Sequence, residues 1–364
     1  MGPGELELGG MSSELGTGGR PGSVSPDDAC ATSSDTAVAL PSVLKLVVDT
    51  SGSMAWPPGW KPASPDDSKP PGATKWEITR DALLAAVDAL PAEVALGVNF
   101  YPNVQQEGTT CLLDEVAAPV ALLGPADSEA RASWAEVAAG VDPVGATPTH
   151  GAYRFGLTQL VATELSGSKF ALLITDGTPT CTIDCSCTEN DVPVDSEPLL
   201  GEARAAFEDG IRTFVIGSPG SEATRGVLSE LAVAGGTARA GCSPSGPEYC
   251  HFDMTSETDL GGALAEALAE IAIQLRSCEY PVPPAPAGEA LDPARVNVLY
   301  TPPGGGTVTI ARDASTSGCE EGWQYSADGD NVVLCGRACE QVRTDATGSV
   351  ELLFGCETVT TQPK

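Results

Sequence analysis

The sequence predicts an α/β protein with a doubly wound, mostly parallel sheet, followed by a small all-β module stapled by disulfides. From residue 43 onward, apolar runs of strand length alternate with amphipathic helical windows, which is typical of a parallel sheet covered on both faces. Past a proline-rich stretch at 278–295 the helical windows stop and short β-rich runs take over. A chain of 364 residues has room for both parts.

The first domain is expected over 42–277, behind a flexible Gly, Ser and Pro-rich tether at 1–41. Its predicted strands are "VLKLVVD" (43–49), "EVALGVNFY" (93–101), "KFALLITDG" (169–177) and "IRTFVIG" (211–217). Its predicted helices cover 76–90, 128–139, 149–164, 202–210 and 258–277. For the last helix, Ser256 and Asp259 suggest a capping box.

The module is expected over 296–364, beyond a linker at 278–295. A domain of this size has a marginal core, so its cysteines are predicted to stabilise it as disulfides: Cys278, Cys319, Cys335, Cys339 and Cys356. Their pairing does not follow from the sequence. Elsewhere in the chain, Cys242 with Cys250 is the local pair that we expect. "SADGDN" (326–331) predicts a hairpin turn, with a Ca²⁺ loop as the alternative.

The net charge of −31, from 50 acidic and 19 basic residues, excludes some partners. Such a chain repels phosphate backbones and anionic lipid, so nucleic acid and membrane surfaces are not expected as partners. The acids are scattered, as on a solvated surface. The sequence contains no apolar run of 18 residues, and we therefore predict no transmembrane helix.

The even number of cysteines, twelve, predicts disulfides and an oxidising compartment. A zinc site is the alternative, but CxxC and CxxH spacings do not occur and the chain has two histidines. The first residues resemble no export signal. We therefore expect a signal or lipid anchor upstream of the given start, the alternative being a cytosolic protein with reduced thiols. Abundant Ala and Gly, with Arg above Lys, suggest a GC-rich bacterial source.

Three separated polar segments are predicted to meet at one edge of the sheet. They are Asp49, Ser51 and Ser53 after the first strand, Thr147 before a helix, and Asp176 after "FALLI". The carboxyl ends of parallel strands form such a binding edge. Hydroxyl and carboxylate oxygens suit Mg²⁺, with Mn²⁺ and Ca²⁺ as alternatives. Helix caps and turns could also explain each segment taken singly.

With these motifs in this order, the chain resembles a von Willebrand factor A (VWA) domain with a metal-ion-dependent adhesion site over residues 42–277, as in bacterial secreted proteins and lipoproteins. The resemblance implies that the hydroxyls of Ser51, Ser53 and Thr147 touch the metal. Asp49 and Asp176 would act through water or orient the hydroxyls. It also implies a non-enzymatic adhesion protein, extracellular, at the cell surface or in the periplasm, whose protein partner completes the metal coordination with an Asp or Glu.

Two loops border this predicted site. The first, after Met54, carries Trp56, Trp60 and Trp76, which either form a recognition surface or pack down to hold the loop. The second, after Asp176, gathers cysteines and acids that favour a disulfide-braced loop over a Cys-based metal site: Cys181, Asp184, Cys185, Cys187, Glu189 and Asp191.

His150 raises the alternative of a metal-assisted hydrolase, since it could act as a general base. No nucleophile elbow accompanies it, so a local contact at the start of a helix is the favoured interpretation. Two further alternatives are a metal-binding subunit of a larger machine and a structural envelope protein with a vestigial site.

Overall fold

The computed structural model describes residues 23–361 apart from 65, 103, 107–108, 113–117, 183–185, 189–191, 285–290, 316–317 and 346. Side chains at 104–106 and 109–112 are also left undescribed. The chain forms two compact units, one over Leu40–Ser277 and the other from Met1–Ala39 together with Cys278–Lys364. The first unit corresponds to the domain expected over 42–277.

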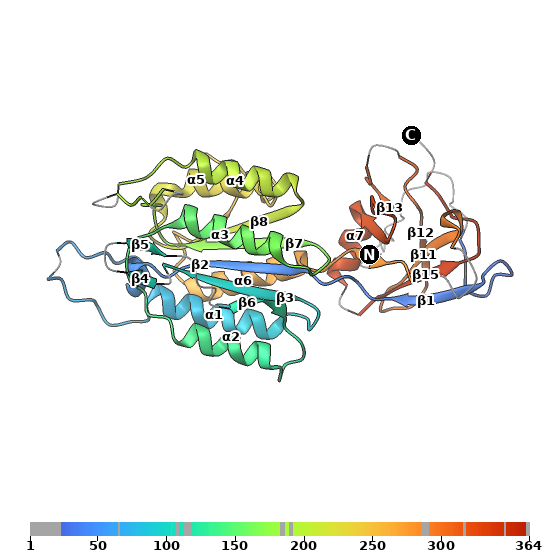
Figure 1. Ribbon diagram of the computed structural model, residues 1–364, viewed down its shortest axis with the longest axis horizontal. Helices are drawn as coiled ribbons and strands as arrows, with labels where there is room; N and C mark the ends of the chain where they lie inside the picture. Colours follow the sequence, from blue (N-terminus) through green and yellow to red (C-terminus); the bar gives the residue numbers. More distant parts are fainter. Residues whose placement is uncertain are drawn as a thin grey trace, which may run out of the picture. The chain divides into compact units, whose positions relative to one another are not determined.

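A six-stranded sheet forms the centre of the first unit (Figure 1), in the order β6-β3-β2-β7-β8-β9. Its strands are β2 (Val43–Asp49), β3 (Ala95–Tyr101), β6 (Ala118–Leu122), β7 (Lys169–Thr175), β8 (Ile211–Gly217) and β9 (Phe252–Asp253). All neighbours pair in parallel except β6, which runs antiparallel at one edge. A short hairpin joins β4 (Val104–Gln106) to β5 (Thr109–Leu112). Because β2 is buried along its whole length, its sequence is nearly continuous in apolar residues.

Helices cover both faces of this sheet (Figure 1), which confirms the predicted doubly wound class. One face packs against α1 (Lys75–Ala89), α2 (Glu129–Ala139) and α6 (Leu260–Gln274). The other packs against α3 (Thr149–Ala162), α4 (Glu197–Glu208) and α5 (Arg225–Ala234). Two 3-10 turns, η1 (Gly52–Ala55) and η2 (Glu222–Thr224), follow β2 and β8. The predicted capping box at Ser256 is wrong: Asp259 is the N-cap of α6 and accepts from the N–H of Gly262.

The second unit contains two small antiparallel sheets. One has the order β1-β15-β11-β12 and the other β10-β14-β13. The strands are β1 (Ser33–Ala37), β10 (Glu279–Pro281), β11 (Val296–Thr301), β12 (Val308–Ile310), β13 (Gly322–Tyr325), β14 (Asn331–Cys335) and β15 (Ser349–Phe354). The turn between β13 and β14 confirms the predicted hairpin at 326–331.

The second unit departs from the predictions in three places. The expected tether at 1–41 contributes β1, which pairs with β15, and the expected linker at 278–295 contributes β10 and the turn η3 (Pro293–Arg295). The unit is also not purely β, because α7 (Gly336–Thr344) follows β14 directly. Polar residues dominate α7, and Cys339 is its buried side chain, which explains why no apolar periodicity reveals it.

Five disulfides join described cysteines: Cys30–Cys356, Cys181–Cys187, Cys242–Cys250, Cys278–Cys339 and Cys319–Cys335. Three of them bind the second unit together, as its marginal core requires. The local pair Cys242–Cys250 is confirmed. Such a set of disulfides indicates an oxidising compartment. In the part of the chain that the structure describes, no helix is long and apolar enough to cross a membrane.

Candidate metal centre

Asp49, the last residue of β2, is a fully buried carboxylate with both oxygens engaged. Its Oδ1 accepts from the backbone N–H of Ser51 at 2.8 Å, and its Oδ2 accepts from the hydroxyl of Thr175 at 2.7 Å. Thr175 ends the neighbouring strand β7, so Asp49 joins two strand ends. The contact with Ser51 fixes the turn that carries both serine hydroxyls.

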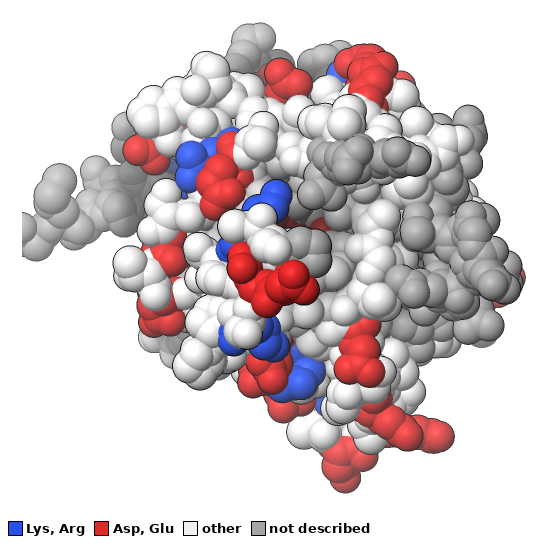
Figure 2. All heavy atoms as spheres, turned by 90° about the vertical axis from the view of Figure 1, so that its left-hand side faces the viewer, with Lys and Arg blue, Asp and Glu red and all other residues white. Residues whose placement is uncertain are grey.

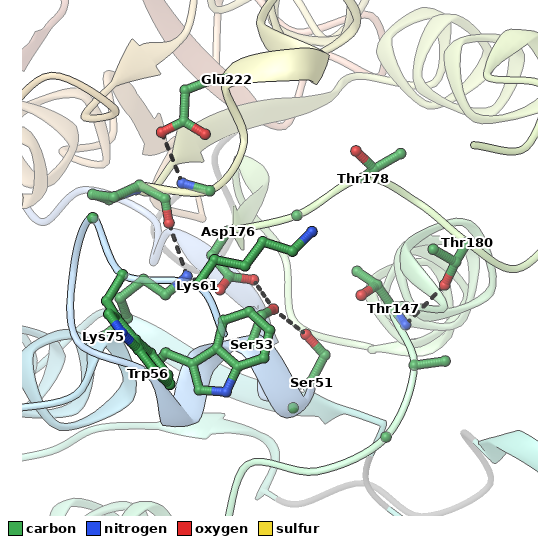
Figure 3. Close-up of a pocket in the computed structure, with 18 residues that line it drawn as sticks. Ser51, Ser53, Trp56, Lys61, Lys75, Thr147, Asp176, Thr178, Thr180 and Glu222 are labelled. Carbon is green, nitrogen blue, oxygen red and sulfur yellow. Dashed lines mark hydrogen bonds and ion pairs between the residues drawn. The ribbon is translucent and has the colours of Figure 1, made fainter. Parts of the chain in front are cut away.

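The serine hydroxyls and Asp176 form a chain of close contacts (Figure 3). The Oγ atoms of Ser51 and Ser53 lie 3.3 Å apart, and Ser53 donates to Asp176 Oδ1 at 2.9 Å. Asp176 is buried directly after β7. Since parallel strands end at the same edge, residues 123 positions apart in the sequence meet there.

Thr147 reaches the same place from the loop that precedes α3. Its N–H donates to the Thr180 hydroxyl and its carbonyl accepts from the Thr180 N–H, both at 3.1 Å. A further bond at 3.0 Å, from the Gly52 N–H to the Gly145 carbonyl, ties this loop to the serine turn. The structure therefore brings the five predicted residues to one sheet edge, with Ser51, Ser53, Thr147 and Asp176 lining a cavity.

The cavity has a volume of about 610 Å³ and opens beside the loop that carries Trp56 and Trp60, here called the tryptophan loop (Figure 3). The half-buried rings of Trp56 and Trp60 line it and meet edge to face, with centroids 6.0 Å apart. Trp76 is instead buried in the core against Phe100. The two alternatives for the loop thus hold for different residues: Trp76 packs down, whereas Trp56 and Trp60 border the site.

The two buried carboxylates, Asp49 and Asp176, carry more negative charge than the one nearby ammonium group neutralises. Burial, reinforced by the Asp176 carboxylate, raises the pKa of Asp49. Burial also raises the pKa of Asp176, although the Lys75 ammonium, ion-paired with Asp176 Oδ2, opposes that rise. A bound cation would stabilise the ionised form of both acids.

The donor set fits a hard divalent cation. The hydroxyls of Ser51, Ser53 and Thr147 and the Asp176 carboxylate are among the groups that line the cavity, and such oxygens are the ligands that Mg²⁺ prefers. Within the described residues, no group of three or more His, Cys, Asp or Glu side chains could hold a metal ion. A cation at this edge would therefore depend on the serine and threonine hydroxyls.

The neighbouring residues resolve two other expectations. Cys181 and Cys187 form a disulfide, whereas Asp184, Cys185, Glu189 and Asp191 lie outside the described residues. His150 is buried in α3 and does not line the cavity, and its ring nitrogens have no hydrogen-bond partner among the described residues. His150 thus lies at the start of a helix, as expected, and burial lowers its pKa.

Lys75 is a site residue that the sequence analysis does not identify, because the predicted helix at 76–90 begins one residue after it. The signal was present in the sequence as Thr74-x-x-Glu77, which forms a capping box and makes Lys75 the first helical residue. A positive charge is unfavourable at a helix N-terminus.

Around the site, charges of both signs are interspersed on the face shown in Figure 2. Acidic side chains stand beside lysines and arginines, without a continuous basic area among the described residues of that face.

Several solved structures resemble the chain. They include the PilB minor pilin of Streptococcus sanguinis (TM-score 0.45, 15% identity, covering 65% of this chain and 62% of that one). The pilus adhesin SpaC of Lactobacillus rhamnosus GG has the same TM-score and identity over 86% of this chain and 39% of its own. A von Willebrand factor type A protein of Catenulispora acidiphila has a TM-score of 0.41 and 17% identity over 91% and 61%.

The chain thus spans less than two thirds of the length of these three structures. Neither a protein-family model nor a curated protein sequence matches it. Its own sheet order, with the DxSxS segment at the carboxyl end of the central strand β2, agrees with the predicted resemblance to VWA domains. By fold, the chain is a doubly wound α/β unit accompanied by a disulfide-bonded antiparallel unit.

Proposed function

We propose that this protein binds a protein partner through a divalent cation held at the Ser51, Ser53 and Thr147 hydroxyls. When bound, the cation would supply a positive centre to which a partner's Asp or Glu can attach. The observation that carries the proposal is the meeting of three hydroxyls and two buried carboxylates, from two strand ends and the loop before α3, at one edge of the sheet beside the cavity.

Each residue of the cluster has a distinct part in this proposal. Asp49 holds the serine turn in place and has no free oxygen, so it acts through Ser51. Ser53 and Asp176 are already hydrogen-bonded to each other, and Thr147 faces them from the opposite loop. Trp56 and Trp60 provide an apolar wall for the partner's flanking residues.

The proposal places the protein outside the cytoplasm, where the five described disulfides persist. Protease added to source cells whose outer envelope has been opened, with the cytoplasmic membrane left intact, tests this location. Protection until the cytoplasmic membrane is broken would contradict it.

Calorimetric titration with Mg²⁺ and Mn²⁺ tests the site itself. The wild type should bind one equivalent. Asp49→Asn should weaken binding by about 10 to 100-fold, the range typical for the loss of a residue that orients metal ligands, and Ser51→Ala, which removes a proposed ligand, should weaken it at least as much. Thr158→Ala, on the exposed side of α3, is the matched hydroxyl control and should bind normally. A wild type without affinity for either ion would favour the vestigial-site alternative.

A further inference from the structure

Lys75 is a buried lysine whose ammonium lies against the candidate metal ligands. The residue is 3% exposed, and its Nζ forms an ion pair with Asp176 Oδ2. The same Nζ donates to the Pro219 carbonyl at 2.9 Å and lies 5.9 Å from the centre of the Trp56 ring. Figure 3 shows Lys75 beside Asp176 and Trp56 at the cavity.

Burial of the Lys75 ammonium at this position destabilises the fold unless nearby carboxylates compensate for it. Burying an ammonium is costly without a partner, and the N-terminus of α1 adds an unfavourable dipole. Asp176 provides the compensation, because two buried carboxylates repel each other and the lysine neutralises one of them. Lys75 therefore occupies a cation position of the cluster.

The loop after β8 is shaped to hold the lysine there. Gly220 has a φ of +116°, and a Cβ at this position would lie 2.3 Å from the Asp176 carbonyl oxygen and 3.1 Å from Lys75 Nζ. Only glycine allows this close approach, which brings the neighbouring Pro219 carbonyl to the ammonium. The lysine pocket is thus built from two separate loops and the start of α1.

We propose that Lys75 is the resident cation of the site: it neutralises Asp176 when no metal is bound and competes with the metal for that carboxylate. This inference rests on the proposed function, whose metal affinity it sets. Lys75 keeps the cluster assembled without metal, at the expense of weaker metal binding. Removing the lysine should therefore tighten metal binding and make the stability of the first unit depend on metal.

The test compares the wild type with Lys75→Met by Mg²⁺ and Mn²⁺ calorimetry and by thermal unfolding in EDTA and in excess Mg²⁺. We expect Lys75→Met to bind at least about tenfold more tightly, since a positive charge in contact with a ligand is lost. Its unfolding temperature should fall in EDTA and recover with Mg²⁺. Equal or weaker metal binding by a folded Lys75→Met would overturn the inference.

Lys45→Met is the matched control. Lys45 is a second buried lysine, on β2, and its Nζ has no hydrogen-bond partner among the described residues. Because it does not pair with Asp176, its removal should leave the metal affinity unchanged. A similar gain of affinity in Lys45→Met would contradict a specific role for Lys75.

A double variant separates this inference from the proposed function. If neither the wild type nor Lys75→Met binds metal, the proposed function fails, while the pairing of Lys75 with Asp176 can still be measured in EDTA. The resident-cation role predicts that adding Asp176→Asn to Lys75→Met restores the lost stability, because the unpaired buried charge is removed. No recovery in the double variant would overturn it. Should Lys75→Met not fold, the same double variant should fold again.

Discussion

At the scale of the residue, the site is defined by the hydrogen-bond partner of each buried oxygen. Asp49 was predicted from its place after an apolar run, and the structure shows why it suits that place: a backbone N–H and a threonine hydroxyl occupy its two oxygens. Thr175, the second partner, could not be identified from the sequence, because it reads as one more β-branched strand residue. Side-chain partners across a sheet depend on register, which the sequence alone does not give.

A residue-scale prediction concerns His251, which is buried with its Nδ1 2.9 Å from the Ser229 hydroxyl. Burial lowers the pKa of His251 to about 4 from its ordinary 6.5, with Arg225 and Arg239 adding to the effect and Asp253 opposing it. The folded state therefore favours the neutral ring. Its stability should fall as the pH drops from 6.5 towards 4, by up to about 3 kcal/mol from this residue.

Urea unfolding of the first unit between pH 7 and 4 measures this effect. His251→Gln should show a shallower loss of unfolding free energy over that range than the wild type. An identical slope in both proteins would show that His251 does not carry the pH dependence.

At the scale of the element, fully buried strands can be predicted from the sequence, whereas exposed or very short strands cannot. The strand "VLKLVVD" was placed with its true bounds because a strand buried on both faces is apolar almost throughout. The edge strands β6 and β9 were missed: the first is half exposed and the second is two residues long, so neither has a clear period. The N-cap of α6 was misplaced because Ser256 and Asp259 are both good capping residues, and only the backbone geometry selects Asp259.

The tryptophan loop provides the element-scale prediction. Trp56 lines the cavity with its ring 5.9 Å from the Lys75 ammonium, so events at the site should alter its surroundings. Saturating Mg²⁺ should change the intrinsic fluorescence of the wild type, and Trp56→Phe should remove most of that change. Trp134→Phe, which alters a core tryptophan in α2, should keep it. Retention of the full signal in Trp56→Phe would separate the loop from the site.

At the scale of the whole molecule, the chain combines a unit with an extensive core and a unit held together by disulfides. The second unit contains residues from both ends of the chain, and Cys30–Cys356 links them across 326 positions. Low-complexity composition made residues 1–41 read as a tether, since the pairing of β1 with β15 is a long-range contact without a local signal. The class of fold can be predicted from local hydrophobic periodicity. The closure of the second unit, by β1 pairing with β15 and by Cys30–Cys356, cannot.

The whole-molecule prediction is that this closure stabilises the second unit. Replacing Cys30 and Cys356 by serine should lower the unfolding free energy of that unit by about 2–4 kcal/mol, because the disulfide restricts the unfolded chain. The unfolding free energy of this unit is measured by guanidinium unfolding. The transition is followed by the fluorescence of Trp323, a buried residue of this unit. The matched variant Cys242→Ser/Cys250→Ser, in the other unit, should leave this transition in place. Equal effects of the two pairs would contradict the assignment.

The central claim, a cation held by hydroxyls at the carboxyl end of β2, is tested most directly by a crystal structure of the protein grown with Mn²⁺ and recorded for anomalous scattering. The account predicts one anomalous peak in the cavity, within coordination distance of Ser51, Ser53 and Thr147. The absence of a peak there under saturating Mn²⁺, or a peak coordinated elsewhere on the chain, would contradict it.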